Sequence, residues 1–202
     1  CDHVSDIVAY DVGALDVLPF VPLRDGATME GAIALAHAAA RRIWERYAIP
    51  SFFYGAAALR DDRRALPAVR RGQFEGLDAR VAQVDDGFDV GDVKHPSAGA
   101  IAIGAREILI AFNVELATGD LAVAKRIARV LRERDGGLRT LRALAFPLDN
   151  GHVQVSLNVT DYAAVPLHRI VEMTRALAAE DGVAVARGEL IGCVPLAAVR
   201  TE

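Results

Sequence analysis

The chain has 202 residues, of which 52% are hydrophobic and 25% charged, and its formal net charge is −4. This size and composition suit one large or two small packed domains and exclude a disordered chain. A mildly acidic chain with dispersed arginines lacks the concentrated basic face that nucleic acid requires. No apolar run reaches the roughly 18 residues of a membrane span, and we expect neither a membrane nor a nucleic-acid partner.

The ends of the chain carry few signals. No basic segment followed by an apolar one indicates a secretory leader near the N-terminus. The two cysteines, Cys1 and Cys193, lie far apart and fit no metal-ligand spacing. We therefore expect two reduced thiols in a cytoplasmic protein.

The first elements predict a strand–helix–strand crossover. Residues 14–21 form a short apolar run typical of a buried strand. Thr28 can cap a helix over residues 29–47, whose apolar stripe consists of Ile33, Ala36, Ala40, Ile43, Trp44 and Tyr47. Residues 51–54 (SFFY) predict a second strand, which would be parallel to the first if both share a sheet.

Residues 55–91 are the least regular part of the chain. Residues 60–64 (RDDRR) form a charge cluster that we expect to be solvated, and residues 66–77 predict a short helix and turn. The run over residues 85–99 is rich in Gly and Asp and predicts a long loop. Loops of this length inside compact domains are commonly functional.

The second half predicts the order β-α-β-β-α-β, the ferredoxin-like plan of an antiparallel sheet with both helices on one face. Its helix over residues 120–134 would turn Val123, Ile127, Val130 and Leu131 inward. Asn-Gly at residues 150–151 predicts a hairpin between two apolar strands. The predicted elements are strands 108–116, 141–148, 153–159 and 183–194, and helices 120–134 and 166–181. We therefore predict an α/β (α+β) fold, a two-lobed sandwich.

Two places could carry chemistry. The polar side chains Gln154, Ser156 and Asn158 alternate along one strand, as on a solvated face or as lining of a cleft. In the long loop, Lys94 and a protonated His95 could both donate to an anion. No histidine pair has i, i+4 spacing, so we expect no metal site. The G-x-S-x-G, P-loop and dinucleotide motifs are absent.

Several segments in order resemble the formiminotransferase family. They include GALDVLPFVP at residues 13–22, LPAVRRGQFE at 66–75 and GAREILIAFNVEL at 104–116. YGAA, QVSLNVTD, PLH and ELIGCVPL also fit, at residues 54–57, 154–161, 166–168 and 189–196. Each match alone is weak, but together they are specific.

The resemblance implies transfer of the formimino group of N-formimino-L-glutamate to tetrahydrofolate in histidine breakdown, with no metal. It implies two α/β lobes, residues 1–105 and 106–202, with folate bound between them. The family's folate-binding stretch falls on the long loop, at Gly91, Asp92, Val93, Lys94, His95, Pro96, Ser97, Ala98 and Gly99. Arg70, Arg71 and Arg106 could contact a folate tail, or form surface salt bridges.

The chain also departs from the family pattern. The family carries H-x-G-x-H-P-R-x before GALDV, and its second histidine, the catalytic acid/base, falls on Ala9. Alanine cannot move a proton, and His3 would substitute only if the segment were shifted. The family's first lobe begins with a further strand–helix–strand portion that has no counterpart in this chain. Without that portion a sheet edge is left uncovered, and either another chain covers it or the given sequence lacks these residues.

Three hypotheses follow. The chain is an active transferase, a relative that binds folate or another anion without turnover, or an interaction module that forms a homodimer. Steady-state turnover, calorimetry with folinic acid and light scattering respectively discriminate them. An enzyme of this family could also dimerise, so the hypotheses overlap.

Overall fold

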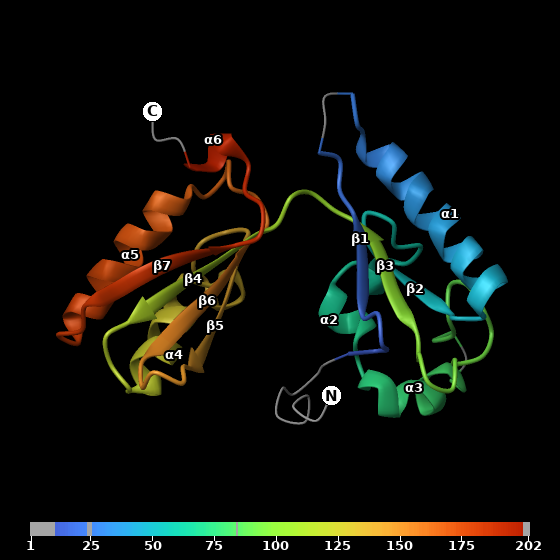
Figure 1. Cartoon of the computed structure of the whole chain (residues 1–202), viewed down its shortest axis with the longest axis horizontal. Coiled ribbons are helices and arrows are strands. Elements are labelled where there is room, and N and C mark those ends of the chain that lie inside the picture. The colour runs from blue at the N-terminus through green and yellow to red at the C-terminus, as the bar shows by residue number, and fades with distance from the viewer. Residues whose placement is uncertain (1–10, 24–25, 84, 200–202) are drawn as a thin grey trace. The chain divides into compact units, whose positions relative to one another are not determined.

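The computed structural model describes residues 11–23, 26–83 and 85–199. The chain divides into two compact units, Cys1–Glu107 and Ile108–Glu202 (Figure 1). Both combine helices with a β-sheet, which confirms the predicted α/β class.

A three-stranded parallel sheet forms the centre of the first unit. Its strands are β1 (Val17–Phe20), β2 (Ser51–Gly55) and β3 (Ile101–Ala105), in the order β1-β3-β2. The first two strands are parallel members of one sheet, as the crossover predicted. They are not neighbours, however, because β3 lies between them.

The central strand β3 is absent from the sequence-based prediction. All five of its residues are buried, since helices cover both faces of the sheet. A strand buried on both faces shows no alternation of polar and apolar residues, which is the pattern by which strands are usually recognised. The signal that remained was a short apolar run between Gly99 and Arg106.

Helix α1 (Met29–Tyr47) covers one face of this sheet, over the predicted range. The Thr28 hydroxyl caps it by accepting a hydrogen bond from the Gly31 N–H at 3.1 Å. Its buried residues are Ala32, Ala36 and Ala40, and these small side chains let the helix pack closely on β3. The prediction was wrong for Tyr47, which is 56% exposed at the end of the helix.

The opposite face is covered by short helices. These are η1 (Asp61–Arg63), α2 (Leu66–Val69) and α3 (Gln73–Val81). The predicted single helix and turn over residues 66–77 is therefore two helices, separated where Gly72 has φ of +85°, a conformation that glycine adopts readily. Val69 and Leu77 pack with Phe52 and Tyr54 of β2 in the core beneath them.

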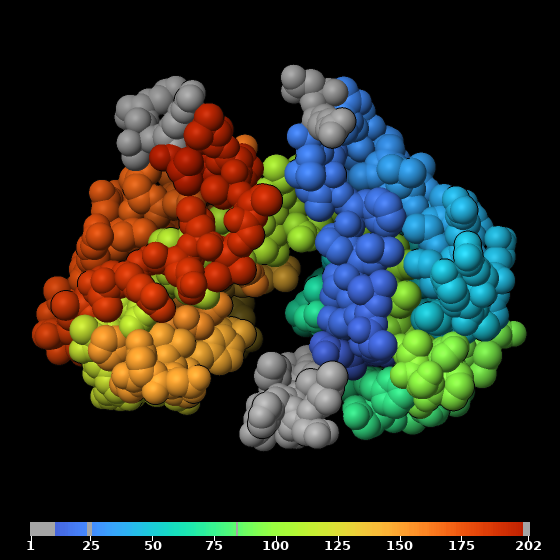
Figure 2. Space-filling view, viewed as in Figure 1, coloured from blue at the N-terminus to red at the C-terminus, as the bar shows by residue number. Residues whose placement is uncertain are grey.

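Strand β1 is an edge of this sheet within the described part of the chain. Asp16 and Phe20 accept hydrogen bonds from β3, at Ala102 N (2.9 Å) and Arg106 N (3.1 Å). By alternation, Val17 and Pro19 turn their backbone groups outward. Pro19 has no N–H, a common way of blunting an edge. Figure 2 shows atoms of this segment, in blue, at the surface of their unit.

The second unit is an antiparallel sheet of order β5-β6-β4-β7. Both α4 and α5 pack on one face of it, so the predicted ferredoxin-like plan is confirmed. The elements are β4 (Ile110–Leu116), α4 (Leu121–Leu131), η2 (Glu133–Asp135), β5 (Leu141–Pro147), β6 (Val153–Val159), α5 (Leu167–Glu180), β7 (Val185–Ile191) and α6 (Leu196–Val199).

Helix α4 is shorter than predicted, and the face that it buries differs slightly from the predicted one. It ends at Leu131, and η2 follows before Gly136 closes the segment with φ of +91°. Its buried residues are Ala124, Ile127, Ala128 and Leu131. Val130, predicted to face inward, is 44% exposed, because Ala124 and Ala128 complete the buried stripe in its place.

Two further findings concern membrane-spanning helices and metal sites. None of the helices within the described ranges is both long and apolar enough to cross a membrane. Within those same ranges, no three His, Cys, Asp or Glu side chains are grouped so that they could hold a metal ion.

Candidate functional site

The loop over residues 91–99 connects the helical layer of the first unit to strand β3. It contains no helix or strand, as predicted, and closes in a turn where His95 and Gly99 exchange backbone hydrogen bonds of 3.1 and 3.0 Å. Ala98 O accepts from Ala14 N at 3.1 Å, which fastens the loop beside the start of β1. A side chain on Gly99 would lie 2.4 Å from the carbonyl oxygen of Val12, so only glycine fits there.

The two anion-contact candidates of this loop differ from expectation. Lys94 lies 4.6 Å from the centre of the Phe74 ring and forms an ion pair with Asp78, so its charge is already partly neutralised. The Nδ1 atom of His95 accepts the Ala98 N–H at 2.9 Å and the Ser97 N–H at 3.3 Å. Nδ1 therefore carries no proton in this geometry, and His95 can donate only through Nε2. The contact of His95 with an anion stays a prediction, and in this conformation it would be made through Nε2.

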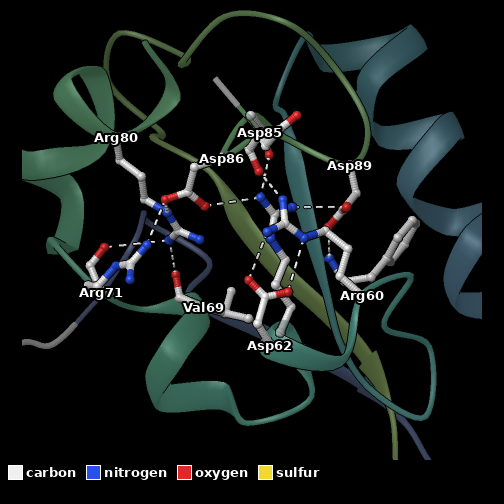
Figure 3. Close-up of polar contacts among 11 residues, drawn as sticks. Arg60, Asp62, Val69, Arg71, Arg80, Asp85, Asp86 and Asp89 are labelled. Carbon is white, nitrogen blue, oxygen red and sulfur yellow. Dashed lines mark hydrogen bonds and ion pairs between the residues drawn. The ribbon is translucent and has the colours of Figure 1, made fainter. Parts of the chain in front are cut away.

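An arginine–carboxylate network connects the short helices of the first unit to residues 85–89, just before the loop (Figure 3). Asp86 accepts from Arg71 at 2.8 Å and Arg80 at 3.0 Å. It also accepts from Arg63 at 3.1 Å. Burial raises the pKa of the Asp86 carboxyl, but hydrogen bonds from the arginines outweigh burial and hold that pKa below its ordinary value.

Arg63 extends the network to strand β2. It donates to Asp89 at 2.9 Å, and Asp89 in turn accepts the Phe53 N–H at 2.7 Å. The guanidinium groups of Arg63 and Arg80 lie 5.0 and 4.3 Å from the centre of the Phe52 ring. The expectation that residues 60–64 are solvated is wrong for Arg63, whose side chain is 3% exposed. The network holds residues 85–90, and so the loop that follows, against the sheet.

The polar row on β6 lies on the sheet face that α4 and α5 leave open. Gln154 and Ser156 are half-buried and Asn158 is exposed, while the intervening residues are buried in the core. Leu144 and Phe146 of β5 pair with Ser156 and Gln154 and are 56% and 44% exposed. This face therefore mixes hydrogen-bonding groups with apolar surface.

Glu115 of β4 lies at one end of this face and is held by three donors. Its carboxylate accepts from Asn150 at 2.9 Å, from His152 Nδ1 at 2.7 Å and from Arg187 at 2.6 Å. The Asn150 hydrogen bond, followed by that of His152, lowers the pKa of Glu115 to about 2. The sequence offered no motif for this cluster, because its members come from two strands, β4 and β7, and from the turn before β6.

The remaining candidates are the three arginines that could contact a folate tail, and the two positions considered for the catalytic acid/base. Arg70 pairs with Asp16, and Arg71 with Asp86, so both form the salt bridges that were one of their two alternatives. Arg106 has no carboxylate partner among the described residues; its Nη1 donates to the Glu107 carbonyl at 3.0 Å. Ala9 and His3 lie outside the described residues.

Comparison with known proteins gives matches over nearly the whole chain. Residues 10–106 match the family model "Formiminotransferase domain, N-terminal subdomain", and residues 111–201 match "Formiminotransferase domain". The chain belongs to the formiminotransferase family. Its two compact units correspond in order to the two matched regions.

Individual formiminotransferases are similar over the same range. The chain is 41% identical over 186 residues to glutamate formimidoyltransferase of Thermoplasma acidophilum, covering 91% of this chain and 61% of the relative. It is 39% identical over 190 residues to the Streptococcus pyogenes enzyme of that name, covering 93% and 63%. Formimidoyltransferase-cyclodeaminase of Sus scrofa is 38% identical, with 93% of this chain and 36% of the relative covered. The chain thus spans about three fifths of the two shorter relatives.

Proposed function

We propose that this chain transfers the formimino group of N-formimino-L-glutamate to tetrahydrofolate, as in histidine breakdown. The proposal rests on one observation: two successive formiminotransferase family models match residues 10–106 and 111–201, and similar relatives are named for formimidoyl transfer. The chemistry needs no redox partner or metal. A folate nitrogen bonds to the formimino carbon, the bond from that carbon to the glutamate nitrogen breaks, and one proton passes from the attacking to the leaving nitrogen.

We assign folate contact to residues 91–99. The support is geometric and chemical: a closed turn held beside β1, an ammonium group at Lys94, and the Nε2 of His95, which forms no hydrogen bond with a described residue. The Asp78 partner of Lys94 has a side chain that is 69% exposed, so an anionic ligand could replace it at modest cost. A carboxylate or polarised carbonyl of folate would accept from both donors.

Calorimetric titration with folinic acid tests this assignment. We expect binding by the wild type and about tenfold weaker binding by Lys94→Ala, since a charge-assisted hydrogen bond contributes on the order of 1.5 kcal/mol. Lys125→Ala, which removes an exposed lysine on α4, is the matched control and should bind as the wild type does. Absence of folinic acid binding, or equal affinity in all three proteins, rejects the assignment.

A second candidate function is folate binding without efficient turnover. Alanine at the family's catalytic histidine position favours it, because removing a positioned acid/base typically slows a reaction about 10²–10⁴-fold. Steady-state assay with N-formimino-L-glutamate and tetrahydrofolate separates the two. Binding with no turnover above background would favour the second function over the first.

We also propose that the protein is a cytoplasmic homodimer. The exposed free thiol of Cys193 suits a reducing compartment. The outer edge of β1 still offers the Val17 N–H and the carbonyl groups of Val17 and Pro19 to a further strand. A monomeric mass in light scattering would contradict the dimer.

A further inference from the structure

The first unit buries the hydroxyl of one tyrosine. Tyr54, near the end of β2, is 4% exposed, and no hydrogen-bond partner for its hydroxyl exists among the described residues. Leaving a buried hydroxyl unpaired costs on the order of 1–3 kcal/mol. Such groups are uncommon in folded proteins and call for an explanation, of which an absent binding partner is one.

Glycine at position 104 sets the direction of this ring. Tyr54 pairs with Gly104 across the sheet, and a Cβ on Gly104 would lie 2.4 Å from Cε1 and 2.6 Å from Cζ of the tyrosine. The ring therefore lies across the glycine backbone, and its hydroxyl is carried over the central strand β3. Any side chain at Gly104 would occupy the place of the ring.

Arg106 supplies the positive charge that acts on the Tyr54 hydroxyl. Its N–H donates to Phe20 O at 3.1 Å, so it continues the ladder of β3 beyond Ala105. Side chains alternate along a strand, so Arg106 lies on the same face as Gly104 and next to Tyr54. Arg70 and Arg71 are engaged by Asp16 and Asp86, whereas Arg106 has no ion-pair partner in the described part of the chain.

The chemistry of the pair selects an anion. Burial raises the pKa of the Tyr54 hydroxyl, and the Arg106 guanidinium, which lies close enough to interact with the hydroxyl oxygen, offsets this only in part, so the hydroxyl is protonated at neutral pH. The guanidinium can only donate, and the phenol O–H is free to donate to a further group, so the pair suits a ligand that offers acceptor oxygens. Both lie at the carboxyl ends of parallel strands, where α/β sheets commonly bind ligands.

We propose that Tyr54 and Arg106 form a carboxylate-binding site for the substrate. The site rests on the proposed function for the identity of its ligand, since N-formimino-L-glutamate and the glutamate tail of folate both carry carboxylates and neither carries phosphate. A carboxylate would accept the Tyr54 proton with one oxygen and an Arg106 N–H with the other.

The test is calorimetric titration of the whole chain with N-formimino-L-glutamate, L-glutamate and folinic acid, each separately. In Tyr54→Phe and Arg106→Gln we expect at least tenfold weaker binding of the ligand whose carboxylate occupies the site. Loss for the two glutamates identifies the formimino donor, and loss for folinic acid alone identifies the folate tail. Tyr47→Phe, at an exposed tyrosine of α1, is the matched control and should bind all three as the wild type does.

If the Tyr54 hydroxyl had a purely structural role, Tyr54→Phe would be less stable than the wild type. Our proposal predicts otherwise. Without ligand, Tyr54→Phe should be at least as stable as the wild type, because it removes an unpaired buried hydroxyl while keeping the ring over Gly104. Unchanged affinity for all three ligands in both variants, or no binding of any of them by the wild type, overturns the proposal. Tyr54-dependent binding of L-glutamate in a protein without turnover would retain the site while rejecting the transferase activity.

Discussion

Replacing Asp86 with alanine is expected to lower the free energy of unfolding by about 3–5 kcal/mol, the usual cost of removing one partner from a buried ion pair. Asp86 is 8% exposed and accepts hydrogen bonds from Arg63, Arg71 and Arg80. Without it, Arg63 keeps Asp89, but the almost fully buried guanidinium of Arg80 loses its carboxylate partner. Urea denaturation followed by circular dichroism measures the loss.

The matched control for Asp86 is Asp62, whose side chain is 60% exposed and pairs with Arg60 at 2.8 Å. Asp62→Ala should cost no more than about 1 kcal/mol, because surface ion pairs are screened by water and salt. Equal losses of unfolding free energy in the two variants would show that the network does not hold residues 85–90 against the sheet. Loss of folinic acid binding in Asp86→Ala below its unfolding transition would further link the network to the loop.

The charges around Arg63 show where sequence reasoning fails. Residues 60–64 contain five charges in a row, and such a run is normally solvated. Burial of one of them depends on Asp86 and Asp89, more than twenty positions later, and on the Phe52 ring. No local pattern encodes a partner at that separation, so only the folded structure could identify the buried arginine.

The elements that were predicted correctly depend on short-range physics. The Thr28 cap and the Asn-Gly turn involve neighbouring residues, and the alternation along β6 needs only one open face. Strand β3 lacks any such local signal, because both of its faces are covered. The general position of the loop was predictable from its glycines and aspartates, but the bonding of His95 and Lys94 was not, since their partners are set by the turn and by α3.

Tyr54 illustrates the same limit within the candidate sites. The sequence placed it in an apolar strand, where a tyrosine is ordinarily a core residue. Its significance comes from two facts that appear only in three dimensions, the glycine beneath its ring and the burial of its hydroxyl without a hydrogen bond to any described residue. Arg106 was a candidate contact from the start, but it became distinct from Arg70 and Arg71 only when their carboxylate partners were known.

Restoring the family's histidine by Ala9→His is expected to raise kcat for formimino transfer by about 10²–10⁴-fold, the usual contribution of a positioned general acid/base. The imidazole would take the proton of the attacking folate nitrogen and return it to the departing glutamate nitrogen. Position 9 lies outside the described residues. Val12, three positions later, is fully buried, and its carbonyl accepts the Ala100 N–H at 2.9 Å, beside the proposed folate-contact residues 91–99.

The control for this gain is Ala9→Asn, which adds a polar side chain of similar reach that cannot titrate between pH 5 and 8. Only the histidine variant should gain rate, and its kcat should change with pH near the ordinary histidine pKa of about 6.5. Equal kcat in the two variants would mean that position 9 does not supply the acid/base here. Full activity in the wild type would also mean that position 9 does not supply the acid/base. A titratable group elsewhere in the chain would then have this role.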